Sequence, residues 1–112
     1  MHLQVKGKNV EVTAALRTYA ESKLEKLGKQ LAEPTQVEIE LSEERNPRVP
    51  ASSVAEGTIF TKGPTIRCRE ASPDMKASID QLADKLERQV KRYREKRVEE
   101  PRRHTPRADE AA

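Results

Sequence analysis

The sequence predicts an α+β fold in which two helices pack on one face of a mostly antiparallel four-stranded sheet. Two segments carry apolar residues at every third or fourth position, as amphipathic helices do. Four shorter segments alternate apolar and polar residues or lie between turn signals, as strands do. Their order is βαβββα, and a two-layer arrangement buries the apolar faces of both helices and sheet. The chain of 112 residues suffices for one domain with a modest core.

The first half of the chain predicts a strand, a helix and a second strand. Residues 2–7 alternate, and the strand they form leads to a helix with Thr13 as its N-cap. Gly28 or the Glu33–Pro34 step is expected to end this helix. Residues 35–44, "TQVEIELSEE", form a half-buried strand whose solvent face carries Glu38 and Glu40. The apolar stripe of the helix consists of Leu16, Ala20, Leu24, Leu27 and Leu31.

The second half predicts a hairpin followed by a long helix. "SVAEGTIF" and "TIRCRE" are strands joined by a turn at Lys62–Pro64, and Gly57 in the first strand indicates a bulge or close packing. The helix is expected to open with Ser72 as N-cap and Pro73 in its first position, and to run about six turns. Its apolar stripe consists of Met75, Ile79, Leu82, Leu86, Val90 and Tyr93.

The domain is expected to span residues 1–97, and residues 98–112 are expected to form a flexible tail or a truncated linker. The tail "VEEPRRHTPRADEAA" contains two prolines and no apolar stripe, which predicts disorder. Its formal charge is −1, so its deletion should preserve the fold and most affinity for a polyanion.

Positive charge is concentrated in the second helix. Residues 85–97 sum to +5, whereas residues 1–84 and 98–112 each sum to −1. On a helical wheel, a basic flank forms beside the apolar stripe, with Ser78 and Gln81 as its neutral members. The opposite flank carries Lys76 and Arg94 together with Asp80 and Glu87. The basic flank comprises Lys85, Arg88, Arg92 and Lys96, and the corresponding flank of the first helix comprises Tyr19, Lys23, Lys26 and Gln30.

Two interpretations of this pattern compete. Lys and Arg are common on solvated helix faces, where they pair with Glu at helical spacing. A basic stripe without acidic neighbours on its own side instead favours binding of a nucleic-acid backbone, with release of counterions. The outer face of the sheet is not expected to bind RNA by stacking, because it carries Glu38 and Glu40 and lacks the aromatic residues of such platforms.

The sequence offers no recognisable catalytic, metal or cofactor site. His2 and His104 lie at the two ends without partners at metal-ligand spacing, and there is no phosphate-binding glycine loop. Cys68 is the only cysteine and is expected to face the core as an inert thiol. No signal peptide or membrane span is visible. We therefore expect a cytoplasmic protein that is not an enzyme, has no cofactor or small-molecule substrate, and does not bind membranes.

The chain resembles the ribosome hibernation-promoting factor family, which includes ribosome-associated inhibitor A. The segments that carry the resemblance are "VKGKNVEVTAALRTYAESKLEKL", "VAEGTI" and "SPDMKASIDQLADKLERQVKRYREK", and the likeness covers about residues 2–97. The combination of "DMKASID" with "KLERQ" is the most specific part. The sequence departs from the family pattern at Gly57, where a β-branched residue is common.

The resemblance implies binding to the small ribosomal subunit and its ribosomal RNA. In the decoding channel the domain would block messenger and transfer RNA and repress translation in stress or stationary phase. Pairing of two ribosomes would require a further C-terminal domain. The alternative is a protein-interaction module that regulates a sigma factor. The family's RNA contacts map onto Lys23, Lys26, Lys85, Arg88, Lys91 and Arg92, with Lys96 added by the charge pattern, while Tyr93 is expected to be structural.

Overall fold

The computed structural model describes residues 2–31 and 35–99, with side chains as far as residue 95. Six elements follow one another in the predicted order. They are β1 (His2–Gly7), α1 (Ala14–Gln30), β2 (Gln36–Glu43), β3 (Ser53–Phe60), β4 (Thr65–Ser72) and α2 (Met75–Glu99).

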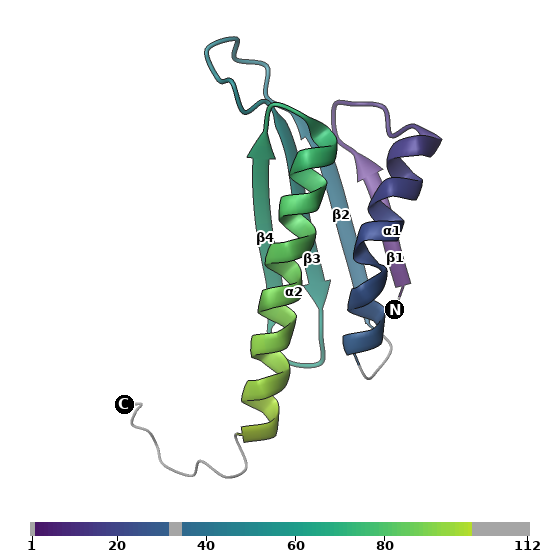
Figure 1. The fold of residues 1–112 in the computed structure, drawn as a ribbon, viewed down its shortest axis with the longest axis vertical. Helices are drawn as coiled ribbons and strands as arrows, with labels where there is room; N and C mark the ends of the chain where they lie inside the picture. Colours follow the sequence, from purple (N-terminus) through teal and green to yellow (C-terminus); the bar gives the residue numbers. More distant parts are fainter. Residues whose placement is uncertain (1, 32–34, 100–112) are drawn as a thin grey trace.

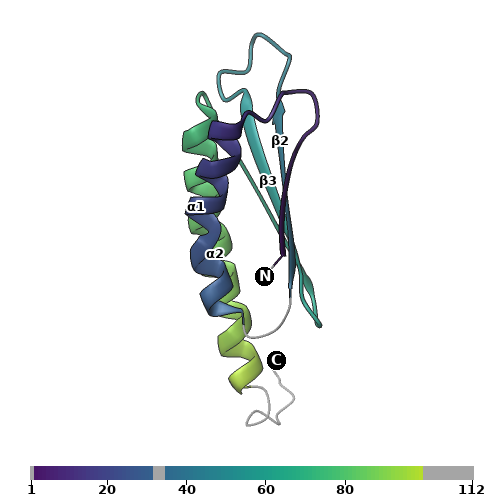
Figure 2. The same ribbon diagram turned by 90° about the vertical axis from the view of Figure 1, so that its right-hand side faces the viewer.

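The sheet has the strand order β1-β2-β3-β4. The β1–β2 pair is parallel, and the β2–β3 and β3–β4 pairs are antiparallel. Both helices lie against the same face, α1 in front of β1 and β2, and α2 in front of β3 and β4 (Figure 1). The view from the side separates the molecule into a helix layer and a sheet layer (Figure 2). This arrangement confirms the predicted α+β fold class.

The core lies between these two layers. Strand β2 shows most clearly how the sequence pattern forms this core. Val37, Ile39 and Leu41 are fully buried, while Glu38 and Glu40 point away from the helices. Alternate side chains of a strand project to opposite faces, so the sequence pattern assigns the inner face directly. Both predicted helical stripes are also buried at their centres. These central residues are Ala20, Leu24 and Leu27 in α1, and Ile79, Leu82, Leu86 and Val90 in α2.

Gly57 lets α2 approach β3 closely. The strand pairing is continuous through this position, where Gly57 lies opposite Ile39 and Cys68, so there is no bulge. A Cβ atom there would lie 2.8 Å from Leu86 Cδ1 and 3.2 Å from Ile39 Cδ1. Close packing is therefore the correct one of the two predicted roles.

Helix α1 begins as predicted, but α2 does not. The Thr13 side chain accepts a hydrogen bond from the Leu16 amide at 3.2 Å. The α2 cap is Asp74, whose Oδ2 accepts from the Ala77 amide at 3.1 Å. The prediction of Ser72 as N-cap and Pro73 in the first helical position is therefore wrong. The reason is that β4 extends to Ser72, which leaves the turn to the two following residues.

The buried hydroxyl of Ser72 instead joins the strand to the helix. Its Oγ donates to the Asp74 carbonyl at 2.6 Å and lies 2.7 Å from Ser78 Oγ. Ser78 is fully buried, and its hydroxyl donates to the Ser53 carbonyl at 2.6 Å. The prediction that Ser78 joins the exposed basic flank is therefore wrong, because this residue faces the ends of β3 and β4.

The ends of the helices differ slightly from the sequence boundaries. Helix α1 continues through Gly28 and ends at Gln30, with the Leu31 amide bonded to the Leu27 carbonyl. Helix α2 runs to Glu99, two residues beyond the predicted domain boundary, and its C-terminal end extends beyond the sheet (Figure 1). The predicted tail beyond Glu99, residues 100–112, lies outside the described residues, as does the Glu33–Pro34 step.

Candidate nucleic-acid interface

The outer surface of α2 presents a row of cationic side chains. Leu82, Leu86 and Val90 fix the rotation of the helix, because all three are fully buried. Arg88, Lys91 and Arg92 then project into solvent, and each is exposed. Within the described part of the chain, neither of the two ion pairs involves these residues. Their charges are consequently available to an anionic ligand.

Lys85 lies on the side of α2 that faces β4. Its ammonium is 3.2 Å from Glu70 Oε2, and both side chains remain partly exposed. A solvent-exposed ion pair contributes little to stability, and salt screens it. Lys85 thus belongs to the edge of the cationic surface, with its charge partly balanced by Glu70.

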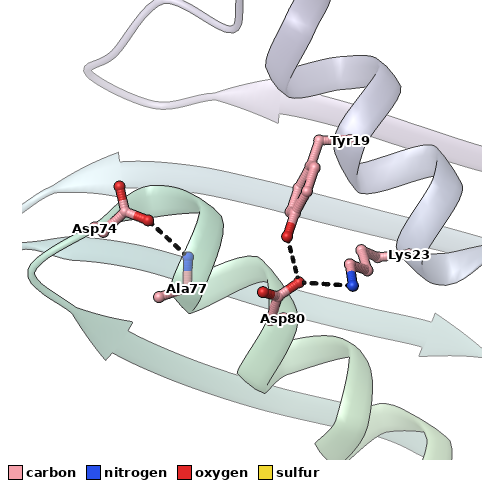
Figure 3. A network of polar contacts seen from close by, with 5 residues as sticks. All are labelled: Tyr19, Lys23, Asp74, Ala77 and Asp80. Carbon is pink, nitrogen blue, oxygen red and sulfur yellow. Dashed lines mark hydrogen bonds and ion pairs between the residues drawn. The ribbon is translucent and has the colours of Figure 1, made fainter.

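Lys23 projects from α1 toward the other side of α2. Its ammonium lies 3.4 Å from Asp80 Oδ1, and the Tyr19 hydroxyl donates to the same oxygen at 2.7 Å (Figure 3). The Lys23 and Lys76 ammonium groups lie 5.6 Å and 5.4 Å from the centre of the Tyr19 ring, within cation–π range. Lys23 is therefore held in the seam between the helices.

The hydrogen bond to Asp80 raises the pKa of Tyr19. Burial of the hydroxyl adds to the shift, as do the negative charges of Asp80 and Asp74. Each of these makes loss of the phenolic proton less favourable. Tyr19 therefore stays a neutral hydrogen-bond donor to Asp80 as the pH rises past the ordinary range of tyrosine.

The two flanks predicted from the sequence come together near the C-terminal end of α1, where Gln30 and Arg88 line one depression. The α1 flank meets the acidic flank of α2, where Tyr19 bonds to Asp80 and Gln30 Nε2 donates to Glu87 Oε2 at 3.3 Å. The basic flank of α2 lies farther round, with Lys85 above β4. Asp80 and Glu87, which the helical wheel placed on the flank opposite the basic one, are thus hydrogen-bond partners of α1.

A depression of about 470 Å³ opens where the C-terminal part of α1 meets α2. Its lining combines three cationic side chains with one acidic and one amide side chain. Sequence reasoning missed Arg94 by placing it on the flank opposite the basic stripe. The sequence contains no signal for which flank of α2 packs against α1, and that contact is what brings Arg94 to the depression. The lining residues are Gln30, Glu87, Arg88, Lys91 and Arg94.

Two predicted RNA-binding residues, Lys26 and Lys96, remain to be placed. Lys26 is exposed on α1, between Lys23 and Gln30 along the helix. Lys96 belongs to α2, but its side chain lies outside the described part of the structure. The described cationic surface therefore consists of Lys26, Lys85, Arg88, Lys91, Arg92 and Arg94, with Lys23 in the adjoining seam.

The outer face of the sheet has a different electrostatic character. A shallow hollow of about 160 Å³ is lined by both acidic and basic side chains. Across the strands, Lys6 is paired in register with Glu40, and Glu56 with Arg69. Glu40 also lies opposite Glu56, and the hollow is lined by three acidic and two basic side chains, so it carries no excess of positive charge. The helix side offers a polyanion more unbalanced positive charge than the sheet side does.

The described residues offer little for chemistry at a thiol or metal. Cys68 is buried, and burial raises the pKa of its thiol, although Lys85 and Arg88 oppose that shift. No cluster of three or more His, Cys, Asp or Glu within residues 2–31 and 35–99 could hold a metal ion. In the same part of the chain, neither helix combines the length and apolar character of a membrane span.

Comparison with known proteins decides the family. The profile of the family described as sigma 54 modulation protein / S30EA ribosomal protein matches residues 3–98. The chain belongs to this family. The match includes both helices with their cationic side chains, so the S30EA fold is the scaffold that positions the surface.

Several relatives of this chain are named as ribosome hibernation factors. A ribosome hibernation promotion factor of Picosynechococcus is 40% identical over 97 residues, which is 86% of this chain and 50% of the relative. A factor of Lactococcus lactis is 35% identical and matched over 54% of its length. The chain thus spans about half the length of these two relatives. A shorter ribosome hibernation promoting factor of Salmonella typhimurium is 34% identical and matched over 96% of its length.

Solved structures agree with the fold. The N-terminal domain of Protein Y from Thermus thermophilus superposes with a TM-score of 0.71 at 32% identity, covering 83% of this chain and 99% of that domain. A ribosomal subunit interface protein from Coxiella burnetii has a TM-score of 0.70 at 26% identity, covering 84% of this chain and 98% of that protein.

Proposed function

We propose that this protein is a ribosome hibernation factor that binds the small ribosomal subunit through its helix side. In this proposal it occupies the decoding channel, blocks messenger and transfer RNA, and represses translation during stress or stationary phase. The observation that carries the proposal is the row of exposed cations on α2, Arg88, Lys91 and Arg92, without ion-pair partners among the described residues. The names of the family relatives supply the ribosome as the target.

The physical basis is attraction between α2 and the RNA backbone. Each cation that neutralises a phosphate releases condensed counterions, which favours binding strongly at low salt. Contacts of this kind carry little sequence information, so the shape of the RNA has to select the site. A rigid helix that extends beyond its sheet suits a channel lined by RNA. A ribosome-bound role would place the protein in the cytoplasm.

Pairing of two ribosomes is not part of the proposal for this chain. The Picosynechococcus and Lactococcus relatives are about twice as long as the region that they share with it. The additional part of those relatives is where we would look for a ribosome-pairing function. The domain itself accounts for binding and obstruction.

A role as a sigma-factor regulator is the second candidate, because the family description includes sigma 54 modulation. A stable protein interface needs a core that is depleted in charge. Among the described residues, Phe60 is the one large apolar side chain exposed to solvent, at 40%, and it lies on β3 away from the helix surface. The surface therefore favours a polyanionic partner over an apolar protein groove.

Charge reversal of Arg88 and Arg92 tests the proposed function. The double variant Arg88→Glu, Arg92→Glu should fail to co-sediment with small ribosomal subunits at physiological salt, while the circular dichroism spectrum stays unchanged. Both residues are exposed, so their substitution should change stability by about 0.5 kcal/mol or less. The lost attraction to phosphate is the cause of the failure.

The matched control is Arg45→Glu with Arg48→Glu. These exposed residues make the same charge change in the loop between β2 and β3, at the end of the molecule opposite the α2 C-terminus (Figure 1). This control should sediment as the unaltered protein does. Retention of the Arg88, Arg92 variant in the ribosomal pellet would contradict the proposed surface.

A further inference from the structure

The depression between α1 and α2 contains an unsatisfied hydrogen-bond acceptor. Gln30 Oε1 is shielded from solvent and has no hydrogen-bond partner among the described residues. The orientation of the amide follows from its neighbour, because the amide nitrogen donates to Glu87 Oε2 and a carboxylate only accepts. The oxygen is therefore the free atom. A buried acceptor without a partner is unfavourable, so a ligand that supplies a donor gains affinity there.

The surroundings of this acceptor define the ligand further. Arg88, Lys91 and Arg94 line the same depression together with Glu87, and none of the three cations takes part in an ion pair with a described residue. A volume of about 470 Å³ is within the range of small-molecule sites and accommodates a nucleotide unit. The ligand therefore has to combine a negatively charged group with a hydrogen-bond donor close by.

We infer that this depression is a ribonucleotide subsite, in which Gln30 Oε1 accepts a hydrogen bond from a ribose 2′-hydroxyl. The neighbouring phosphate binds among Arg88, Lys91 and Arg94. Every ribonucleotide carries these two groups side by side whatever its base, whereas an amino group on a base is more distant from the backbone. The 2′-hydroxyl is the group that distinguishes RNA from DNA.

This inference rests on the proposed function, because it takes RNA as the ligand of the helix surface. It adds a specific role for Gln30, which carries no charge and contributes nothing to long-range attraction. The long side chains around the depression have to shift to admit the ribose, since solvent does not reach the oxygen. Arg and Lys side chains on an exposed surface have many accessible rotamers, which makes such a shift feasible.

The test compares three labelled 12-nucleotide strands of one sequence, made of RNA, DNA and 2′-O-methyl RNA. Fluorescence anisotropy at 50 mM salt measures their affinities for the full chain. RNA should bind about 3- to 10-fold more tightly than DNA, the range of one net hydrogen bond. The 2′-O-methyl strand lacks the donor but keeps the RNA-like sugar conformation, so it should bind about as weakly as DNA.

The variant Gln30→Met removes the acceptor and keeps a side chain of similar length. It should lose the preference for RNA while its affinity for DNA stays unchanged, and the DNA measurement also reports that the variant is folded. Gln4→Met, at an exposed position on β1 in the sheet layer, is the matched control and should keep the preference.

Equal affinity of the unaltered protein for RNA and DNA, or binding of neither strand, would overturn the inference. So would 2′-O-methyl RNA that binds as tightly as RNA, or a Gln30→Met variant that keeps the RNA preference or loses both affinities equally. Sedimentation with small ribosomal subunits is measured in parallel. Normal ribosome binding with any of these results removes the Gln30 subsite alone, whereas loss of ribosome binding by the unaltered protein removes the proposed function.

Discussion

Asp80 organises the seam between the two helices. One of its carboxylate oxygens accepts the Tyr19 hydroxyl at 2.7 Å and lies 3.4 Å from the Lys23 ammonium. The same carboxylate thereby joins α1 to α2 and offsets a cation near the candidate interface. Replacing it by an amide should release Lys23 and change the titration of Tyr19 together.

The titration of Tyr19 should be measurable by absorbance at alkaline pH. The sequence contains two tyrosines, and the pKa of Tyr19 is raised from its ordinary value of 10.0 in the folded protein. Above pH 10 the unfolded chain loses this proton first, so the contribution of Tyr19 to stability is complete below pH 10 and is lost as the pH rises through the folded pKa. Asp80→Asn should lower the pKa of Tyr19 and reduce that loss. A titration curve unaffected by Asp80→Asn would show that the hydrogen bond does not cause the shift.

Packing of α2 against β3 and β4 fixes the direction of the cationic side chains. Leu86 is fully buried at the centre of this contact, and Gly57 leaves the space into which Leu86 fits. If the helix rotated, Arg88 and Arg92 would point elsewhere. The stability of this contact is therefore part of the geometry of the candidate interface.

The Leu86→Ala substitution should lower the free energy of unfolding by about 2–5 kcal/mol, through lost burial and a residual cavity. Gly57→Ala alone should cost about 1–3 kcal/mol, because its new methyl group would overlap Leu86 Cδ1. In the double variant the methyl group enters the space left by Leu86. The loss of unfolding free energy in the double variant should therefore be smaller than the sum of the losses in the two single variants. Urea unfolding measures all three.

The control for this cycle combines Gly57→Ala with Leu24→Ala. Leu24 is buried on α1 and is not one of the three side chains nearest to Gly57, so this pair should be additive. Additivity in the Leu86 pair would show that Gly57 does not accommodate α2.

The elements themselves were predictable because their signals are local. The alternation of Val37, Ile39 and Leu41, and the stripe through Leu82 and Leu86, depend only on strand and helix periods. The N-cap of α2 was predicted wrongly because the end of β4 at Ser72 depends on pairing with Ser53 across the sheet. Contacts between segments that are distant in the sequence leave no local signal. The burial of Ser78 and the side chains that pack around Gly57 depend on such contacts and could not be predicted.

The whole molecule separates its charges between two sides. The hollow on the sheet side is lined by three acidic and two basic residues, whereas the helix side presents Arg88, Lys91, Arg92 and Arg94, which have no described ion-pair partners. The helical phase of the charges predicted Arg88 and Arg92 as RNA-binding residues, and the family resemblance added Lys91. The sequence could not predict the depression that includes Gln30 and Arg94, since that depends on how the helices are placed side by side.

The salt dependence of binding to small ribosomal subunits tests the central claim most directly. For each phosphate contact, the logarithm of the binding constant should fall by about 0.7–0.9 per logarithmic unit of salt. Neutralising two contacts with Arg88→Gln and Arg92→Gln should weaken binding and reduce this slope by roughly 1.5, since each lost phosphate contact removes its own share. A slope that the double substitution leaves unchanged, or binding that does not respond to salt, would contradict recognition of ribosomal RNA by α2.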